Sequence, residues 1–200
     1  MDIRLNAHVE CLDGRIGRLE NIILNPHTER VTYLVVREND IANTLRLVPE
    51  NAIKEASPDT ISLSISKKKF DRMKNFIHEE YIPSNIMLYM AEDAGWDSLG
   101  TPAALIIEHE AIPAGGLVVH KGAGVFATDG HVGRVDEFLV EKKTGRITHL
   151  ILREGHLWGK KDISVPINQV DRYEDGKAYL TIDRDAVKDL PLIDIKRKGK

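Results

Sequence analysis

The chain contains the same sequence pattern twice. The first copy begins at Leu12 and reads LDGRIGRLENIILNPHTERVTYLVVRE, and the second begins at Thr128 and reads TDGHVGRVDEFLVEKKTGRITHLILRE. At an offset of 116 the identical pairs are Asp13/Asp129, Gly14/Gly130, Gly17/Gly133, Arg18/Arg134, Thr28/Thr144, Arg30/Arg146, Thr32/Thr148, Leu34/Leu150, Arg37/Arg153 and Glu38/Glu154. A one-residue insertion then shifts the offset to 117, where Val48 and Pro49 match Val165 and Pro166. A period this long indicates two homologous domains rather than a solenoid of short repeats.

Each copy has the pattern of short antiparallel strands joined by tight turns. The Asp-Gly dipeptides that end at Gly14 and Gly130 lie between runs of alternating apolar residues, which is a strong hairpin signal. Because a type I′ turn needs positive φ, we expect both glycines to adopt it in two-residue turns. A later turn contains Gly145 in the second copy. The first copy has Pro26 and His27 there without a glycine, which predicts a different turn geometry.

The end of each copy predicts a closing strand followed by a helix. Pro49 and Pro166 cannot donate to a central ladder and mark the end of a short strand. Ser66 and Asp183 suit the N-cap position of a helix, and the apolar spacing extends the first helix over about 67–80. The predicted fold is therefore mainly β, with two small antiparallel β-barrels, each followed by a short helix.

These features resemble the PRC-barrel. The resemblance is carried by the Asp-Gly turn and its following strand, the strand after TGRI, the Val-Pro step, the closing LTI strand and the final Leu190 and Pro191. It covers roughly residues 5–80 and 121–195, and the second copy is the closer match. PRC-barrels occur in the H subunit of the photosynthetic reaction centre and at the C-terminus of the ribosome maturation factor RimM. The resemblance implies barrels that support large complexes and that do not catalyse reactions.

The expected domain organisation follows from the repeat. Residues 1–82 form the first barrel with its helix, 83–116 an irregular and partly apolar connecting segment, 117–195 the second barrel, and 196–200 a basic tail. We expect the two barrels to pack as an internal pseudo-dimer with an approximate two-fold axis, because each is small enough to be marginally stable alone. We expect the connecting segment to lie along the barrel surfaces, and the sequence leaves a homo-oligomer open.

Composition and charge narrow the classes of partner. The net charge is −3 and the pI is about 6.2, so no general positive field attracts nucleic acid or an anionic membrane. A single cysteine, Cys11, excludes an internal disulfide. No apolar run is long enough to span a membrane, and the charged start after Met1 does not resemble a signal peptide. We therefore expect a cytoplasmic protein without a membrane span, and nucleic acid is not an expected partner.

Residues suited to chemistry are few. We find no catalytic or nucleotide-binding motif, and we assign no catalytic, cofactor-binding or metal-binding residues. The tripeptides HEE from His78 and EHE from Glu108 indicate solvated charge rather than a metal site. Trp158, flanked by glycines and followed by Lys160 and Lys161, could contact a protein partner. Packing of its indole on the barrel is an equally open interpretation.

Three functions are compatible with the sequence. The first is a non-catalytic protein-interaction or assembly module built of two PRC-barrels, with no cofactor and an unknown protein partner. The alternative is an RNA- or ribosome-associated maturation factor, which the acidic balance disfavours. The third is an enzyme with a site between the barrels, and only the unassigned segment 83–116 favours it.

Overall fold

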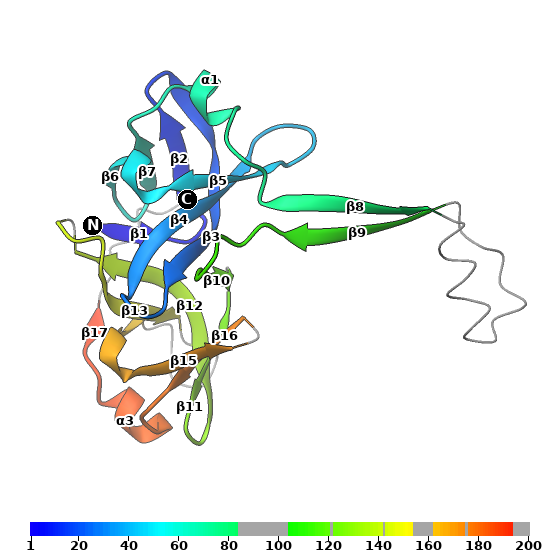
Figure 1. The fold of residues 1–200 in the computed structure, drawn as a ribbon. Helices are drawn as coiled ribbons and strands as arrows, with labels where there is room; N and C mark the ends of the chain where they lie inside the picture. The colour runs from blue at the N-terminus through cyan, green and yellow to red at the C-terminus, as the bar shows by residue number, and fades with distance from the viewer. Residues whose placement is uncertain (84–103, 121, 142, 154–161, 175, 194–200) are drawn as a thin grey trace, which may run out of the picture. The chain divides into compact units, whose positions relative to one another are not determined.

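The chain is mainly β. A computed structural model describes residues 1–83, 104–120, 122–141, 143–153, 162–174 and 176–193 (Figure 1). The chain divides into two compact units, one formed by Met1–Lys74 with Ile112–Lys200 and the other by Asn75–Ala111. The first unit contains both copies of the repeat, and the second contains a two-stranded hairpin.

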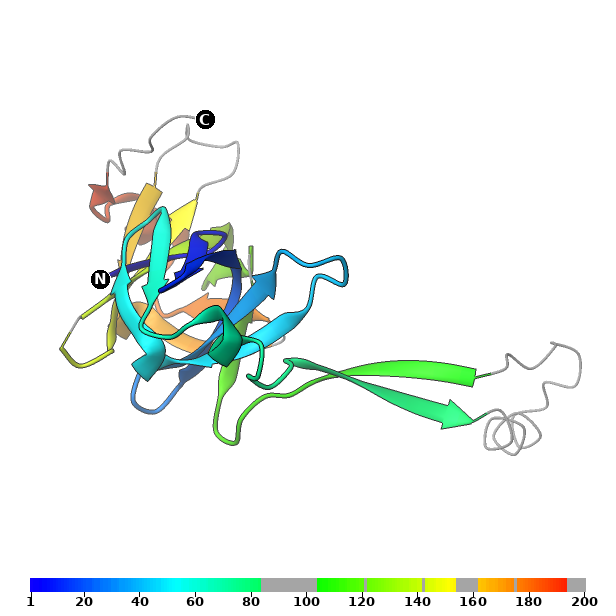
Figure 2. The ribbon, with the colours of Figure 1, turned by 90° about the horizontal axis from the view of Figure 1, so that it is seen from above.

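The first copy forms one sheet with the strand order β5-β4-β3-β2-β7-β6. Its strands are β2 (His8–Cys11), β3 (Gly14–Asn25), β4 (Arg30–Glu38), β5 (Leu45–Pro49), β6 (Ile53–Ala56) and β7 (Thr60–Leu63). The 3-10 helix η1 (Glu50–Ala52) follows β5, and the helix α1 (Lys67–Phe70) follows β7. In Figure 2 these strands, coloured blue to cyan, curve round a common interior.

The second copy forms a sheet with the same order of matching strands, β14-β13-β12-β11-β16-β15. Its strands are β11 (Gly124–Ala127), β12 (Gly130–Val140), β13 (Ile147–Arg153), β14 (Asp162–Pro166), β15 (Val170–Glu174) and β16 (Lys177–Leu180). The helices η2 (Ile167–Gln169) and α3 (Arg184–Lys188) take the places of η1 and α1. A short strand, β17 (Leu192–Ile193), pairs with β14.

Two features of the sheets differ from the predicted antiparallel barrels. β2 runs parallel to β7, and β11 runs parallel to β16. Parallel neighbours need a long connection rather than a tight turn, and the four intervening strands of each copy provide it. Among the described residues no pairing joins the two end strands of either sheet, so each sheet is open along that line.

The two copies exchange strands with each other. β1 (Asp2–Arg4) precedes the first sheet in sequence but pairs with β12 of the second, and β10 (Leu117–His120) precedes the second sheet but pairs with β3 of the first. Ile3 lies opposite Phe138, and Val119 lies opposite Ile22. Each of these residues is 116 positions from its counterpart, so the two contacts are equivalent and reciprocal. Reciprocal contacts of this kind define an approximate two-fold axis.

A second reciprocal contact joins the β3–β4 and β12–β13 turns. Arg30 and Arg146, which are equivalent residues, form an antiparallel bridge. The amide of Val31 donates to the Gly145 carbonyl at 3.2 Å, and the amide of Ile147 donates to the Glu29 carbonyl at 2.8 Å. These bonds again exchange equivalent groups, so the same two-fold relation holds at a site distant in sequence from the paired strands.

The β3–β4 turn of the first copy has a left-handed residue where the second copy has Gly145. Glu29 has φ of 54°, close to the 69° of Gly145 at the equivalent position. The Asn25 side chain accepts hydrogen bonds from the amides of His27 and Thr28, which holds the turn without glycine. The Glu29 carboxylate also pairs with Arg146 at 2.7 Å. Local hydrogen bonds therefore offset the strain of a left-handed glutamate.

One apolar core extends through both copies. Buried side chains of the two sheets form a single cluster, and it includes Ile3 and Val119 of the exchanged strands and Phe138 of β12. The two sheets therefore share their interior instead of having separate cores.

The helix predicted over 67–80 is wrong beyond its first turn. The helix α1 ends at Phe70, and the chain then forms β8 (Ile77–Pro83), which pairs with β9 (Ala104–Glu110). Phe70, Met73, Phe76 and Ile77 recur at helical spacing, although in the structure they do not share one helix. The segment 83–116 is thus partly regular, and its predicted boundary falls inside β8. Residues 84–103 lie outside the described residues.

The turns at the two Asp-Gly pairs differ from the predicted type I′ turns. Gly14 and Gly130 have φ of 134° and 146°. Cys11 pairs with Gly14 and Ala127 pairs with Gly130, so each glycine begins a strand instead of forming the centre of the predicted type I′ turn. The central residues are therefore Leu12 and Asp13 in one copy and Thr128 and Asp129 in the other, and none of these four has positive φ.

The aspartate of each Asp-Gly pair connects its hairpin to the helix that follows the sheet. The Asp13 carboxylate accepts from the amide of Lys67, and the Asp129 carboxylate accepts from the amide of Arg184, both at 2.8 Å. These amides open α1 and α3. The carboxylates therefore satisfy backbone donors at the helix starts and hold each helix against its hairpin.

The two glycines of β3 differ in the space that is available for an added side chain. A Cβ at Gly14 would meet no atom within 4 Å, whereas a Cβ at Gly17 would lie 1.9 Å from the Arg37 carbonyl oxygen of β4. Gly14→Ala should cost about 1 kcal/mol of unfolding free energy through its positive φ. Gly17→Ala should cost about 3 kcal/mol, because the β3–β4 pairing must move apart. Urea denaturation of both variants measures the difference, and equal midpoints would contradict it.

The strand exchange predicts that the copies depend on each other. Residues 1–82 and 117–200, expressed separately, each lack a strand of their sheet, and we expect both to be less stable than the full chain. The full chain should unfold the two sheets in one cooperative transition. Calorimetry and chemical denaturation of the three proteins check this. If both pieces keep the stability of the full chain, and the full chain shows two independent transitions, the copies are independent domains.

Candidate functional site

The residues that the sequence singled out for a partner contact are Trp158, Lys160 and Lys161. They belong to 154–161, which lies outside the described residues. The described neighbours of this segment are β13 and β14, so the segment links two adjacent strands of the second sheet.

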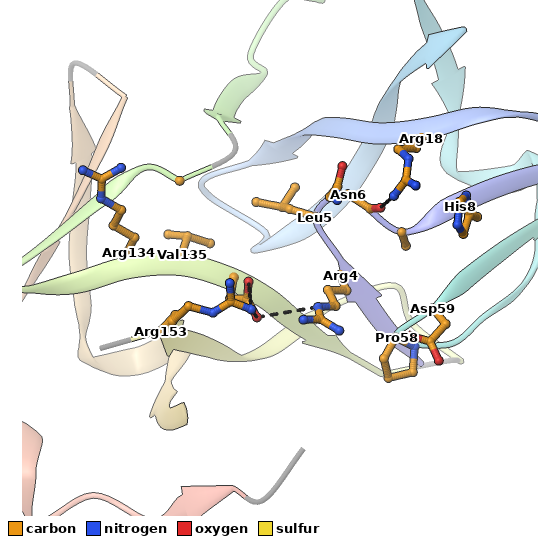
Figure 3. Close-up of a pocket in the computed structure, with 13 residues that line it drawn as sticks. Arg4, Leu5, Asn6, His8, Arg18, Pro58, Asp59, Arg134, Val135 and Arg153 are labelled. Carbon is orange, nitrogen blue, oxygen red and sulfur yellow. Dashed lines mark hydrogen bonds and ion pairs between the residues drawn. The ribbon is translucent and has the colours of Figure 1, made fainter. Parts of the chain in front are cut away.

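A cavity of about 750 Å³, which we call the main cavity, lies where the two copies meet (Figure 3). The first copy contributes β1, the turn after it, the start of β2, one residue of β3 and the turn before β7. The second copy contributes β12, β13 and a glycine that precedes β11. The lining is Arg4, Leu5, Asn6, Ala7, His8, Arg18, Pro58, Asp59, Gly122, Arg134, Val135, Asp136 and Arg153.

An ion-pair cluster that bridges the copies forms one wall of this cavity. Asp136 of β12 is largely buried and pairs with Arg153 of β13 at 3.0 Å. It also faces Arg4 of the exchanged strand β1 at 3.6 Å, and Arg4 is itself largely buried. The amide of Leu5 donates to the Asp136 carbonyl at 3.1 Å, which extends the β1 contact by one residue. Strand exchange therefore brings a guanidinium of the first copy to a carboxylate of the second.

The remaining arginines of the cavity have fewer partners. Arg18 donates to the Asn6 carbonyl at 3.1 Å. The Arg134 side chain makes no ion pair or hydrogen bond with the part of the chain that the structure describes. Figure 3 shows Arg18 and Arg134 on opposite sides of the cavity, with Arg153 and Arg4 along its lower edge. These guanidinium groups give the cavity its chemical character, because arginine is the side chain best suited to bind oxyanions in a bidentate manner.

His8 adds a titratable group to the lining. Its Nδ1 is buried and has no hydrogen-bond partner among the described residues. Burial lowers the pKa of His8, and the positive charges of Arg18 and Arg15 lower it further, while Asp59 opposes them. The imidazole is therefore neutral at pH 7.

A smaller cavity, of about 340 Å³, lies at the second reciprocal contact. Leu24, Leu117, Ile147 and Ile167 give it an apolar lining, and Tyr173 borders it. The Tyr173 hydroxyl is buried without a partner among the described residues, and burial raises the pKa of this phenol. A buried phenol with an elevated pKa stays neutral, so this cavity offers an apolar surface and one hydroxyl.

The structure does not support a reactive thiol at Cys11 or a metal site at the HEE and EHE tripeptides. Burial raises the pKa of Cys11 to about 11, so its thiol stays protonated and unreactive at neutral pH. The HEE and EHE tripeptides meet across the β8–β9 hairpin, and Glu80 pairs with His109 at 3.0 Å. Within the described residues no three His, Cys, Asp or Glu side chains gather closely enough to hold a metal ion.

The amino-acid sequence contains only a partial signal for the main cavity. Arg18 and Arg134 stand out as a repeated pair, but repetition alone is equally typical of charged side chains that cover a sheet edge. Arg4 and Asp136 give no signal, because they come together only through the exchange of β1. A sequence pattern does not show which copy an edge strand joins.

Comparison with known proteins finds a similarity over part of the chain. Residues 121–188 match the PRC-barrel domain family. No curated protein matches the chain. Among the described helices, none has the length and apolar character that crossing a membrane would require.

A buried carboxylate lies beside the cavity. Glu137 follows Asp136 on β12, lies opposite Arg4 of β1, and is 1% exposed. Its Oε2 has no partner among the described residues. Burial raises the pKa of Glu137 to about 7, the charge of Asp2 adds to the rise, and Arg4 opposes it. The first copy has the neutral Asn21 at the matching position.

Glu137 should make stability depend on pH. From about pH 4.5 to about pH 7 the folded state retains a proton that the unfolded state releases, so stability falls as pH rises through this window. Glu137→Gln should remove this dependence. Its free energy of unfolding should exceed that of the wild type by on the order of 3 kcal/mol at about pH 8, and match it near pH 4.5.

Denaturant unfolding across this pH range measures the effect, with the exposed Glu55→Gln as a control that keeps the wild-type profile. If Glu137→Gln shows the same slope with pH as the wild type, Glu137 ionises normally in the folded state.

Proposed function

We propose that this protein is a non-catalytic, cytoplasmic protein-interaction or assembly module, built of two PRC-type barrels that pack as an internal pseudo-dimer. The match of residues 121–188 to the PRC-barrel domain supports this for the second copy. The identical order of matching strands supports it for the first copy. The reciprocal exchange of β1 and β10 supports a rigid scaffold, since backbone hydrogen bonds and one continuous core connect the two copies.

The observation that carries the proposal is a fully exposed apolar side chain on an ordered loop. Ile41, between β4 and β5, is completely exposed to solvent. The loop that presents it is fixed by Asp40, whose carboxylate accepts from the Thr44 amide at 2.9 Å and from the Thr44 hydroxyl at 2.7 Å. These hydrogen bonds lower the pKa of Asp40, so the carboxylate remains charged at neutral pH. A pre-ordered apolar side chain loses little conformational entropy when a partner covers it.

The second copy has a matching stretch of sequence. Residues 154–161 stand between β13 and β14 in sequence, as the Ile41 loop stands between β4 and β5, and at an offset of 116 Leu157 matches Ile41. Trp158 follows immediately in sequence. Large apolar residues at two matching places in the sequence suit a partner that contacts the protein at two points, and tryptophan is a frequent anchor of such contacts.

Affinity capture from native lysate tests the proposal. The wild-type protein, cross-linked and analysed by mass spectrometry, should retain a protein partner. Ile41→Ser and Trp158→Ser should each weaken its retention at least about tenfold, because a buried apolar anchor contributes more than 1 kcal/mol. Leu12→Ser is the matched control, since Leu12 is also exposed but lies at the β2–β3 turn, and it should retain the partner.

Two outcomes would contradict the proposal. Retention of the partner unchanged in both loop variants would show that the loops are not the interface. Recovery of ribosomal proteins that is lost after ribonuclease treatment would instead favour the RNA-associated function.

A further inference from the structure

The main cavity lies on the pseudo-two-fold axis of the molecule. Two pairs of equivalent residues line it together, Asn6 with Gly122 and Arg18 with Arg134. The members of each pair are 116 positions apart and are related by the same two-fold relation as the exchanged strands. When both members of a pair line one cavity, the axis that relates them passes through that cavity. Arg18 and Arg134 therefore approach it from opposite copies, as Figure 3 shows.

The charge of the cavity is opposite to that of the chain. Four arginines and two aspartates line it, while the whole chain has a net charge of −3. Asp136 is already paired with Arg153 and faces Arg4. Arg18 donates only to a carbonyl, and Arg134 has no partner in the described part of the chain. Within the described residues, the two axis-related guanidinium groups thus line the cavity without carboxylate partners, although a guanidinium always carries its charge.

The size of the cavity indicates a ligand larger than a simple ion. Its volume of about 750 Å³ is in the range of small-molecule sites and exceeds what a single phosphate ion fills. The lining is not only charged, since Leu5, Ala7, Pro58 and Val135 contribute apolar surface. A molecule with an organic middle and anionic ends would match this distribution of groups.

We propose that this cavity binds a small organic molecule that carries two oxyanion groups, phosphate or carboxylate, one held by Arg18 and the other by Arg134. The site goes beyond the interaction function, and neither copy forms it alone. His8 lies at the Arg18 side of the lining and supplies an unpartnered Nδ1 that can form a further hydrogen bond. Arg4 and Arg153 keep Asp136 neutralised, so that this carboxylate does not repel the ligand.

Calorimetric titration of the full-length protein tests the site. The probes are fructose 1,6-bisphosphate, adipate and orthophosphate, at constant ionic strength set with sodium chloride. We expect one-to-one binding of the bisphosphate or of the dicarboxylate, whichever group the site prefers, and the tighter probe identifies the chemistry of the natural ligand. Orthophosphate should bind at least tenfold more weakly, because it reaches only one arginine. Arg18→Gln and Arg134→Gln should each weaken the tighter probe at least tenfold.

Arg72→Gln is the control, because Arg72 is exposed, does not line the main cavity, and has a side chain that makes no hydrogen bond or ion pair with the described residues. It should bind the probe as the wild type does. The proposal is wrong if no probe binds saturably at millimolar concentration, if Arg134→Gln binds as tightly as Arg72→Gln, or if orthophosphate binds as tightly as the two-headed probes. Circular dichroism of each variant confirms that its fold is intact, so a loss of binding reports on the site.

Discussion

The reciprocal pairing of β1 with β12 and of β10 with β3 is the interaction on which the rest of the structure depends. β3 pairs with β2 only over Gly14 to Arg18, so the second half of this long strand would otherwise present an unpaired edge. β10 covers that edge, and β1 covers the matching edge of β12. Unpaired strand edges expose backbone donors and acceptors and favour aggregation. The duplication therefore supplies each copy with the strand that the other needs.

The internal repeat predicted much of the fold, because identical residues at a constant offset must occupy equivalent places. It predicted that the strands would end at Pro49 and Pro166, and it located both Asp-Gly hairpins. It did not predict the parallel β2–β7 contact or the β8–β9 pairing, because the periodicity of a segment indicates its type of secondary structure and not the strand with which it pairs. It also missed the cavity, because Arg4 and Asp136 meet only through the strand exchange.

Near the pseudo-two-fold axis, equivalent positions of the two copies carry different side chains. The main cavity contains His8 and Arg4 of the first copy, whereas the second copy has Gly124 and His120 at the equivalent positions. The buried Glu137 likewise stands where the first copy has Asn21. A symmetric homodimer could not have different side chains at equivalent positions, because its two subunits have the same sequence. Joining two copies in one chain allows the backbone to keep the two-fold relation while the polar groups around the axis become asymmetric.

Arg4 connects this asymmetry to the stability of the fold. Its backbone is part of the exchanged strand β1, and its side chain faces Asp136 in the cavity wall. The same residue lies opposite Glu137, where its positive charge opposes the rise in the pKa of the buried carboxyl. Release of β1 would therefore remove a guanidinium from the cavity and leave two neighbouring acidic side chains without it. Because these effects share one strand, ligand binding in the cavity and the pairing of β1 with β12 must be thermodynamically linked. A ligand that binds only the intact cavity stabilises the strand exchange. The size of this stabilisation depends on the affinity and the concentration of the ligand.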